Sequence, residues 1–200
     1  ILAENIQIKK DKRTLGELDC LLTRNEEPIH LEIIYKFYLY DATVGTTEIE
    51  HFIGPNRKDA LIEKLNKLKK KQLPLLYSND CKPYLDEYDI EIEKVKQEVL
   101  FKAQLFLPFS NQDIQLTKLN IDCVQGFFIN RKELEYIKDS KFYIPTKKDW
   151  LITPHEQVSW ITYPSFSNKI KEFEARNFSP LVWIKSKNGK LSKCFIVWWP

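Results

Sequence analysis

The chain of 200 residues lacks methionine altogether, and it has no run of apolar residues long enough to cross a bilayer. Its first residues also lack a basic stretch followed by a long apolar segment, so we expect no signal peptide. These absences predict a cytoplasmic protein without a membrane partner. Because the sequence begins at Ile1 rather than at a methionine, we expect the native start to lie upstream.

Closely spaced cysteine pairs are also missing. The four cysteines stand far apart in the sequence and none forms a C-x-x-C motif, which argues against a zinc ribbon and against a disulfide scaffold. We therefore expect reduced thiols in an intracellular protein. The four positions are Cys20, Cys81, Cys123 and Cys194.

The balance of charge says little about partners. The chain has 31 basic and 28 acidic residues, which gives a net charge of +3. At 200 residues it is long enough to bury a core as one domain, or as one domain with an extension.

Residues with high β propensity dominate the predicted elements, and turn residues separate them. A short helix is predicted at 131–138. The Asn188-Gly189 pair between two β-rich runs predicts a C-terminal hairpin over 181–199. The predicted strands are Asn5–Ile8, Gly16–Leu22, Ile29–Tyr40, 95–106 and 120–129.

The strand predicted at Ile29–Tyr40 has two different faces, since side chains alternate along a strand. We expect one face to be core and the other to be mixed and to carry the charges. The expected core face has Ile29, Leu31, Ile33, Tyr35, Phe37 and Leu39, and the mixed face has His30, Glu32, Ile34, Lys36 and Tyr38.

A helix is predicted from about Arg57 to Gln72, ended by Pro74, with a stripe of leucines that packs on the sheet. This segment has seven basic residues against two acidic ones, a net +5 that exceeds the charge of the whole chain. Its lysine run is either a solvated face or a nucleic-acid-binding surface. The leucines are Leu61, Leu65 and Leu68, and the lysines expected in solvent are Lys67, Lys70 and Lys71.

Two acids stand in segments that otherwise read as buried strand. Asp19 and Glu32 lie on consecutive predicted strands, so they can be neighbours across a ladder. Two close carboxylates repel unless a cation lies between them, and Mg²⁺ or Mn²⁺ satisfies that need with carboxylates, waters and phosphate oxygens. Lys36 can then stabilise charge on a phosphate, and Glu17 is a candidate extra ligand. The alternative is a structural ion-pair network, in which His30 is an ordinary core or edge histidine.

The segments "TLGELD", "HLEIIYKFYL" and "GPNRKDALIEKLNKLKKKQLPL" resemble domain-of-unknown-function family 1853, a group of bacterial proteins. The resemblance continues through "KAQLFLPF", "WLITP" and "FIVWWP", so it covers nearly the whole chain. In that family a "GPN" precedes a helix that carries an Asp, a Lys and a Gln. These correspond here to Asp59, Lys64 and Gln72.

That family is in turn similar to the PD-(D/E)xK nuclease superfamily. The similarity implies an α/β (α+β) fold in which a helix, three strands, a helix and a fourth strand form a restriction-endonuclease-like core around a mixed sheet. It also implies that Asp19 and Glu32 are the metal ligands and that Lys36 is the catalytic lysine. Lys36 stands four residues after Glu32 rather than two, about 13 Å along a strand instead of about 7 Å. A β-bulge, or Lys64 reaching in from the helix, would compensate.

The similarity also predicts the domain organisation and the function. We expect a nuclease-like core at 1–107, with its first helix upstream of Ile1, and an extension at 108–200. The expected function is a Mg²⁺-dependent nuclease that acts on DNA, with Gln72 and His30 as supporting residues. Two alternatives stay open: an inactive nuclease-like fold that binds nucleic acid through Lys67, Lys70 and Lys71, and a protein-interaction module that uses the C-terminal hairpin.

Overall fold

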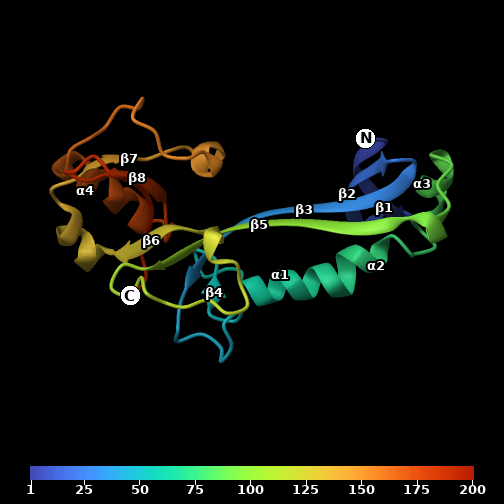
Figure 1. Ribbon diagram of the computed structural model, residues 1–200, viewed down its shortest axis with the longest axis horizontal. Helices are drawn as coiled ribbons and strands as arrows, with labels where there is room; N and C mark the ends of the chain where they lie inside the picture. The colour runs from blue at the N-terminus through green and yellow to red at the C-terminus, as the bar shows by residue number, and fades with distance from the viewer. The chain divides into compact units, whose positions relative to one another are not determined.

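A computed structural model describes all residues, 1–200. The chain is an α+β protein whose mixed, mostly antiparallel sheet is flanked by few helices (Figure 1). Two compact units emerge from its contacts: unit 1 has Ile1–Lys36 and Ile62–Ala103, and unit 2 has Phe37–Leu61 and Gln104–Pro200. The expected domain division at 107/108 stays a prediction.

Unit 1 is built on a meander of three antiparallel strands, with a fourth strand beside the third. These strands confirm the predicted ones and are longer at most ends. The third and fourth strands continue into unit 2. The four elements are β1 (Ala3–Lys10), β2 (Arg13–Arg24), β3 (Glu27–Tyr40) and β5 (Lys96–Pro108).

The predicted helix begins four residues late, because Arg57 adopts a left-handed conformation and the Gly54 N–H bonds the Asp59 carbonyl at 2.7 Å. It also continues past Pro74, which we expected to end it. The Leu73 N–H bonds the Leu68 carbonyl five residues back, which makes a π turn. We attribute this wider turn to Pro74, which lacks an N–H and would clash with a regular α-turn. The segment consists of α1 (Leu61–Lys67), the π-helix η1 (Leu68–Gln72) and α2 (Leu73–Leu75).

Within unit 1 the expected faces of the third strand are wrong from Glu32 to Tyr35, although Ile29 is buried as expected. Ile33 and Tyr35, expected in the core, are 48% and 43% exposed. His30 and Glu32, on the face expected to be mixed, have no exposure at all. The helical segment runs along β3 and β5 (Figure 1). Gln72 donates to Glu32 and so ties the segment to that face of β3, and Gln97 of β5 donates to the Leu73 carbonyl. A hydrophobicity pattern alone does not show which face a later helix covers.

The core of unit 1 lies between the meander and short helical turns that follow α2. These turns are α3 (Lys82–Glu87) and the 3₁₀ segment η2 (Ile92–Lys94). The buried cluster consists of Ile6, Ile8, Leu18, Leu21, Leu76, Cys81, Leu85, Ile90 and Val95.

Unit 2 combines parallel and antiparallel pairing. Strand β6 pairs in parallel with both β5 and β9, whereas β7, β8 and β9 form antiparallel pairs. Its strands are β4 (Phe52–Ile53), β6 (Val124–Asn130), β7 (Lys141–Tyr143), β8 (Leu181–Lys185) and β9 (Leu191–Val197). Its helical elements are η3 (Ile121–Cys123), η4 (Arg131–Ile137), η5 (Lys147–Leu151) and α4 (Tyr163–Glu174).

The predicted C-terminal hairpin is confirmed as β8 and β9, and Gly189 in its turn has a φ of +84°. The predicted helix at 131–138 is the 3₁₀ segment η4, and the strand predicted at 120–129 begins only at Val124. Within unit 2 the hairpin end anchors the "GPN" loop. The Pro55 carbonyl accepts bonds from Ser179 Oγ at 2.7 Å and from Trp199 Nε1 at 2.9 Å.

Candidate functional site: an acid pair beneath a lysine-rich helix

The two predicted acids lie where the β2–β3 ladder ends. The last paired residues are Cys20 and Leu31, and Asp19 and Glu32 are the next residues along the two strands. Here the Ile33 N–H donates to Asp19 Oδ2 at 2.8 Å. A side-chain carboxylate thus accepts the bond from β3 beyond the end of the backbone ladder, and this fixes Asp19 beside the strand that carries Glu32.

Glu32 is fully buried, and neighbouring donors hold both of its oxygens. His30 Nε2 lies 3.0 Å from Oε1, and Gln72 Nε2 donates to Oε2 at 2.6 Å. A buried carboxylate without such partners would cost several kcal/mol. The helical segment therefore stabilises the acid and also fixes its orientation.

The tautomer of His30 follows from its second partner. Gln97 Nε2 donates to the Leu73 carbonyl at 2.8 Å and lies 3.0 Å from His30 Nδ1. An amide nitrogen only donates, so Nδ1 accepts and the proton sits on Nε2, which donates to Glu32. In this arrangement His30 aims an N–H at Glu32.

Lys64 reaches the acids through Gln72, because its Nζ donates to Gln72 Oε1 at 2.6 Å. Burial lowers the pKa of Lys64 below its usual value, and the nearby charge of Lys67 lowers it further. Glu32 and Asp19 act in the opposite direction, which places both acids within electrostatic range of this amine.

Lys36, our sequence-based choice for the catalytic lysine, is half-buried and lies close enough to Lys64 that its charge also lowers the pKa of Lys64. Both candidate lysines therefore lie in the same part of unit 1. The structure gives Lys64 a defined path to Glu32 through Gln72, and the choice of Lys36 stays a prediction.

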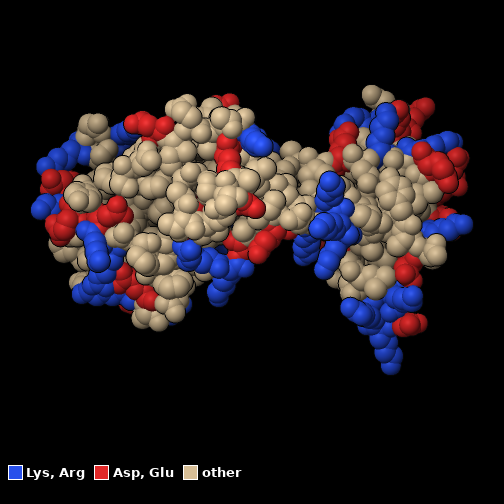
Figure 2. Space-filling view, turned by 90° about the horizontal axis from the view of Figure 1, so that it is seen from below, with Lys and Arg blue, Asp and Glu red and all other residues tan.

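A cavity of about 360 Å³ opens between β2 and the helical segment. Asp19 and Glu17 line one side, and Lys67 and Lys71 line the other, with Gln72 between them. As predicted, Lys67, Lys70 and Lys71 are exposed. Figure 2, seen from the side on which α1 lies in Figure 1, shows lysine and arginine side chains gathered there.

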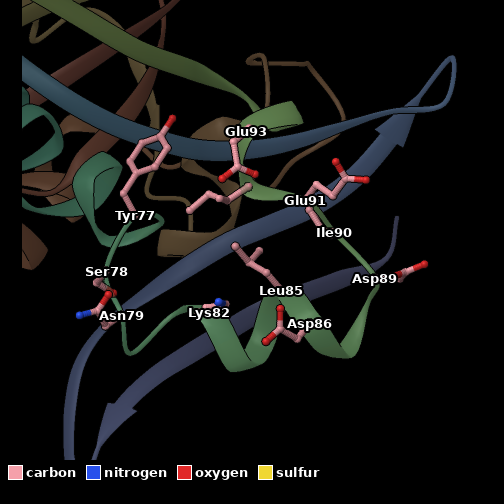
Figure 3. A pocket seen from close by; sticks show the side chains of 11 residues that line it. Tyr77, Ser78, Asn79, Lys82, Leu85, Asp86, Asp89, Ile90, Glu91 and Glu93 are labelled. Carbon is pink, nitrogen blue, oxygen red and sulfur yellow. The ribbon is translucent and has the colours of Figure 1, made fainter.

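A larger cavity of about 510 Å³ in unit 1 lies away from these residues. Figure 3 shows Leu85 rising from α3 into it, with Glu91 and Glu93 on the segment that follows. Acids dominate its polar lining, with Asp86, Asp89, Glu91 and Glu93 against Lys82 alone. Such a lining repels phosphates, so the smaller cavity is the better candidate despite its size.

The donor chemistry of the acid pair fits a hard divalent cation, since Asp19 and Glu32 offer only oxygen atoms. No group of three or more His, Cys, Asp or Glu side chains in the chain is arranged to hold a metal ion. Glu17 is thus not gathered with the other two acids into one cluster. Two carboxylates completed by water and phosphate oxygens are nevertheless a usual way for proteins to bind Mg²⁺.

The sequence profile described as Domain of unknown function (DUF1853) matches residues 1–197. The chain belongs to this family. The resemblance found in the "GPN" and helix segments is thereby confirmed at the level of the family. No curated protein and no solved structure gives a significant match. No helix of the DUF1853 chain has the length and apolar character needed to cross a membrane.

Sequence reasoning missed Gln97 as a member of this site. The residue lies near the start of β5, and its position in the strand resembles that of other half-buried polar residues. Only the fold shows that it bonds both the helical segment and His30.

Proposed function

We propose that this DUF1853 protein is a metal-dependent phosphodiesterase of the PD-(D/E)xK type that acts on DNA. The observation that carries the proposal is the geometry of Asp19 and Glu32. They occupy adjacent strands at the end of a ladder, and Asp19 lines a cavity together with Lys67 and Lys71.

The order of elements in unit 1 supports the same proposal. Three antiparallel strands, a helical segment and a fourth strand beside the third follow one another along the chain. The first acid lies on the second strand, and the second acid lies on the third. This is the order that the similarity to the nuclease superfamily implies.

In this proposal Asp19 and Glu32 hold Mg²⁺ or Mn²⁺. When bound, such an ion polarises a phosphoryl oxygen and lowers the pKa of a bound water. Gln72 and His30 keep Glu32 in one orientation through their hydrogen bonds. Lys36 or Lys64 places a positive charge where negative charge develops on the scissile phosphate.

One observation favours the second candidate, an inactive nuclease-like fold that binds nucleic acid. Glu32 has no solvent exposure, and both of its oxygens already accept hydrogen bonds. A metal ion would have to share those oxygens with His30 and Gln72. The interaction-module reading gains less support, because most of the terminal hairpin is buried and Trp198 is its one large hydrophobic residue with substantial exposure.

Calorimetric titration with Mn²⁺ and with Mg²⁺ tests the proposal. The wild-type chain should bind one divalent ion, and Asp19→Asn should lose that binding. Glu93→Gln, which removes an exposed acid from the other cavity, is the matched control and should bind as the wild type does. Equal binding by Asp19→Asn would remove the metal site from this pair of strands.

A further inference from the structure

The lysines of the helical segment are not equivalent. Lys67 and Lys71 line the cavity that Asp19 also lines, whereas Lys69 and Lys70 are exposed outside it. No hydrogen bond or ion pair in the structure engages the amine of Lys67 or of Lys71. Both amines are therefore available to an anion that enters the cavity.

Positive charge accumulates on the helical side of the cavity, where Glu32 and Asp19 offset part of it. Lys67 and Lys36 both disfavour the charged form of Lys64, which means that the amines around the acid pair repel one another. An anion placed among them relieves that repulsion. Because Asp19 and Glu17 occupy the opposite side of the cavity, the anion belongs on the lysine side.

Apart from Gln72, the remaining lining is apolar, and the space is small. Leu15, Gly16 and Leu75 complete the cavity, whose volume of about 360 Å³ lies at the lower end of the range for small-molecule sites. A single nucleotide has the matching composition, with a phosphate for the two amines and a sugar and base for the leucines.

We propose that the cavity between β2 and η1 is a nucleotide subsite in which Lys67 and Lys71 bind the phosphate and Leu15 and Leu75 contact the sugar or base. The subsite deepens the proposed function by giving its substrate class a place to bind. The binding itself rests only on the cavity and does not depend on cleavage. Lys70, one residue from Lys71, takes no part in it.

The test is titration of the full chain with thymidine 5′-monophosphate in EDTA, so that no metal contributes. Lys67→Ala and Lys71→Ala should each weaken binding about tenfold, as expected for a lost charge-assisted bond to phosphate. Lys70→Ala, the matched control, should bind as the wild type does. All three positions are exposed, so the variants should unfold at the wild-type temperature.

Titrations with thymidine and with inorganic phosphate measure the contribution of each part of the nucleotide to binding. Both should bind more weakly than the monophosphate, because each fills only half of the subsite. Inorganic phosphate binding as tightly as the monophosphate would overturn the nucleotide assignment in favour of a free-phosphate site. Equal losses in the Lys67, Lys70 and Lys71 variants would overturn the subsite and leave a diffuse basic surface.

Failure of the nucleotide subsite can be distinguished from failure of the proposed phosphodiesterase activity. A chain that binds the nucleotide through Lys67 and Lys71 but never cleaves DNA keeps the subsite and loses the phosphodiesterase. A chain that cleaves DNA with unchanged affinity in both variants keeps the phosphodiesterase and loses the subsite.

Discussion

Glu32 shows how one residue links strand, helix and site. Its burial would be costly, and hydrogen bonds from His30 and Gln72 offset that cost. Those same bonds join β3 to the π-helix and bring Lys64 to the site through Gln72. The residue therefore contributes to folding of unit 1 whether or not it also binds a metal ion.

Substitution distinguishes the roles of the two candidate lysines, Lys36 and Lys64. Lys36→Ala should abolish DNA cleavage and leave metal binding and folding unchanged if the rigid strand supplies the catalytic amine. Lys64→Ala should then mainly lower stability or substrate affinity, because its amine bonds Gln72. Rates and KM measured for both variants decide between them. The reverse pattern, with turnover lost only in Lys64→Ala, would assign the catalytic charge to the helix.

Lys193, in unit 2, is another buried ionisable residue and is 4% exposed. Its Nζ donates to Gln104 Oε1 at 2.9 Å and to the Trp150 carbonyl at 2.7 Å. Burial lowers the pKa of Lys193 to about 8, from 10.5. Both acceptors can be satisfied by the charged or the neutral amine, so burial alone disfavours the charged form.

This lowered pKa predicts stability that rises with pH. Below about pH 8 the amine is charged in both folded and unfolded chains, and the burial penalty is present in full. Between about pH 8 and 10.5 only the unfolded chain keeps the proton, so the free energy of unfolding should increase by about 3 kcal/mol. Urea unfolding across this range measures the slope, and Lys193→Met should flatten it. Equal slopes in the two proteins would show that the pKa is not lowered.

At the scale of elements, the sequence predicted the strands and turns whose signal lies within a few neighbouring residues. Asn188-Gly189 identified the terminal hairpin, and the alternation of β-branched and aromatic residues identified β3. The sequence did not show the π turn before Pro74, which depends on how the helix accommodates a missing N–H. Helix α4 was missed although Pro164, Phe166 and Ile170 gave a signal for it.

The candidate site was also predictable only in part, because some of its contacts join residues far apart in the sequence. Asp19 and Glu32 stood out because charges are unusual inside strands, and the short turn between the strands made them neighbours. The face of β3 that is buried could not be read from its sequence, since Gln72 and Leu73 of a later helix cover it. The role of Gln97 could not be predicted from the sequence, because it bonds His30 of β3 and the Leu73 carbonyl of the helical segment.

The close approach of β6 and β9 gives a prediction for glycines. A Cβ on Gly126 would lie 2.1 Å from the Lys193 carbonyl oxygen, so Gly126→Ala must push two paired strands apart. We expect a loss of about 3 kcal/mol in the free energy of unfolding. Gly189→Ala meets no neighbouring atom but keeps a positive φ, and it should cost about 1 kcal/mol. Thermal unfolding of both variants checks the order, which a smaller loss in Gly126→Ala would contradict.

At the scale of the whole molecule, the net positive charge is small and is concentrated in one segment. The chain as a whole has a net charge of only +3, yet residues 57–72 alone contribute +5. Attraction of a phosphate backbone therefore depends on this one segment, and its strength should fall as salt is added. Asp19 and Glu17 line the cavity beside the same segment, whereas Glu32 is fully buried behind Gln72.

The central claim is that Asp19 and Glu32 support metal-dependent hydrolysis, and cleavage of labelled single-stranded and double-stranded DNA tests it most directly. The wild-type chain should cleave at least one of them with Mg²⁺ or Mn²⁺ and neither in EDTA. Asp19→Asn should be slower by about a hundredfold or more, since a metal ion contributes several kcal/mol to the transition state. Glu93→Gln should cleave at the wild-type rate. Cleavage by Asp19→Asn at the wild-type rate would contradict the account, as would a wild-type chain that binds the ion and cleaves neither substrate.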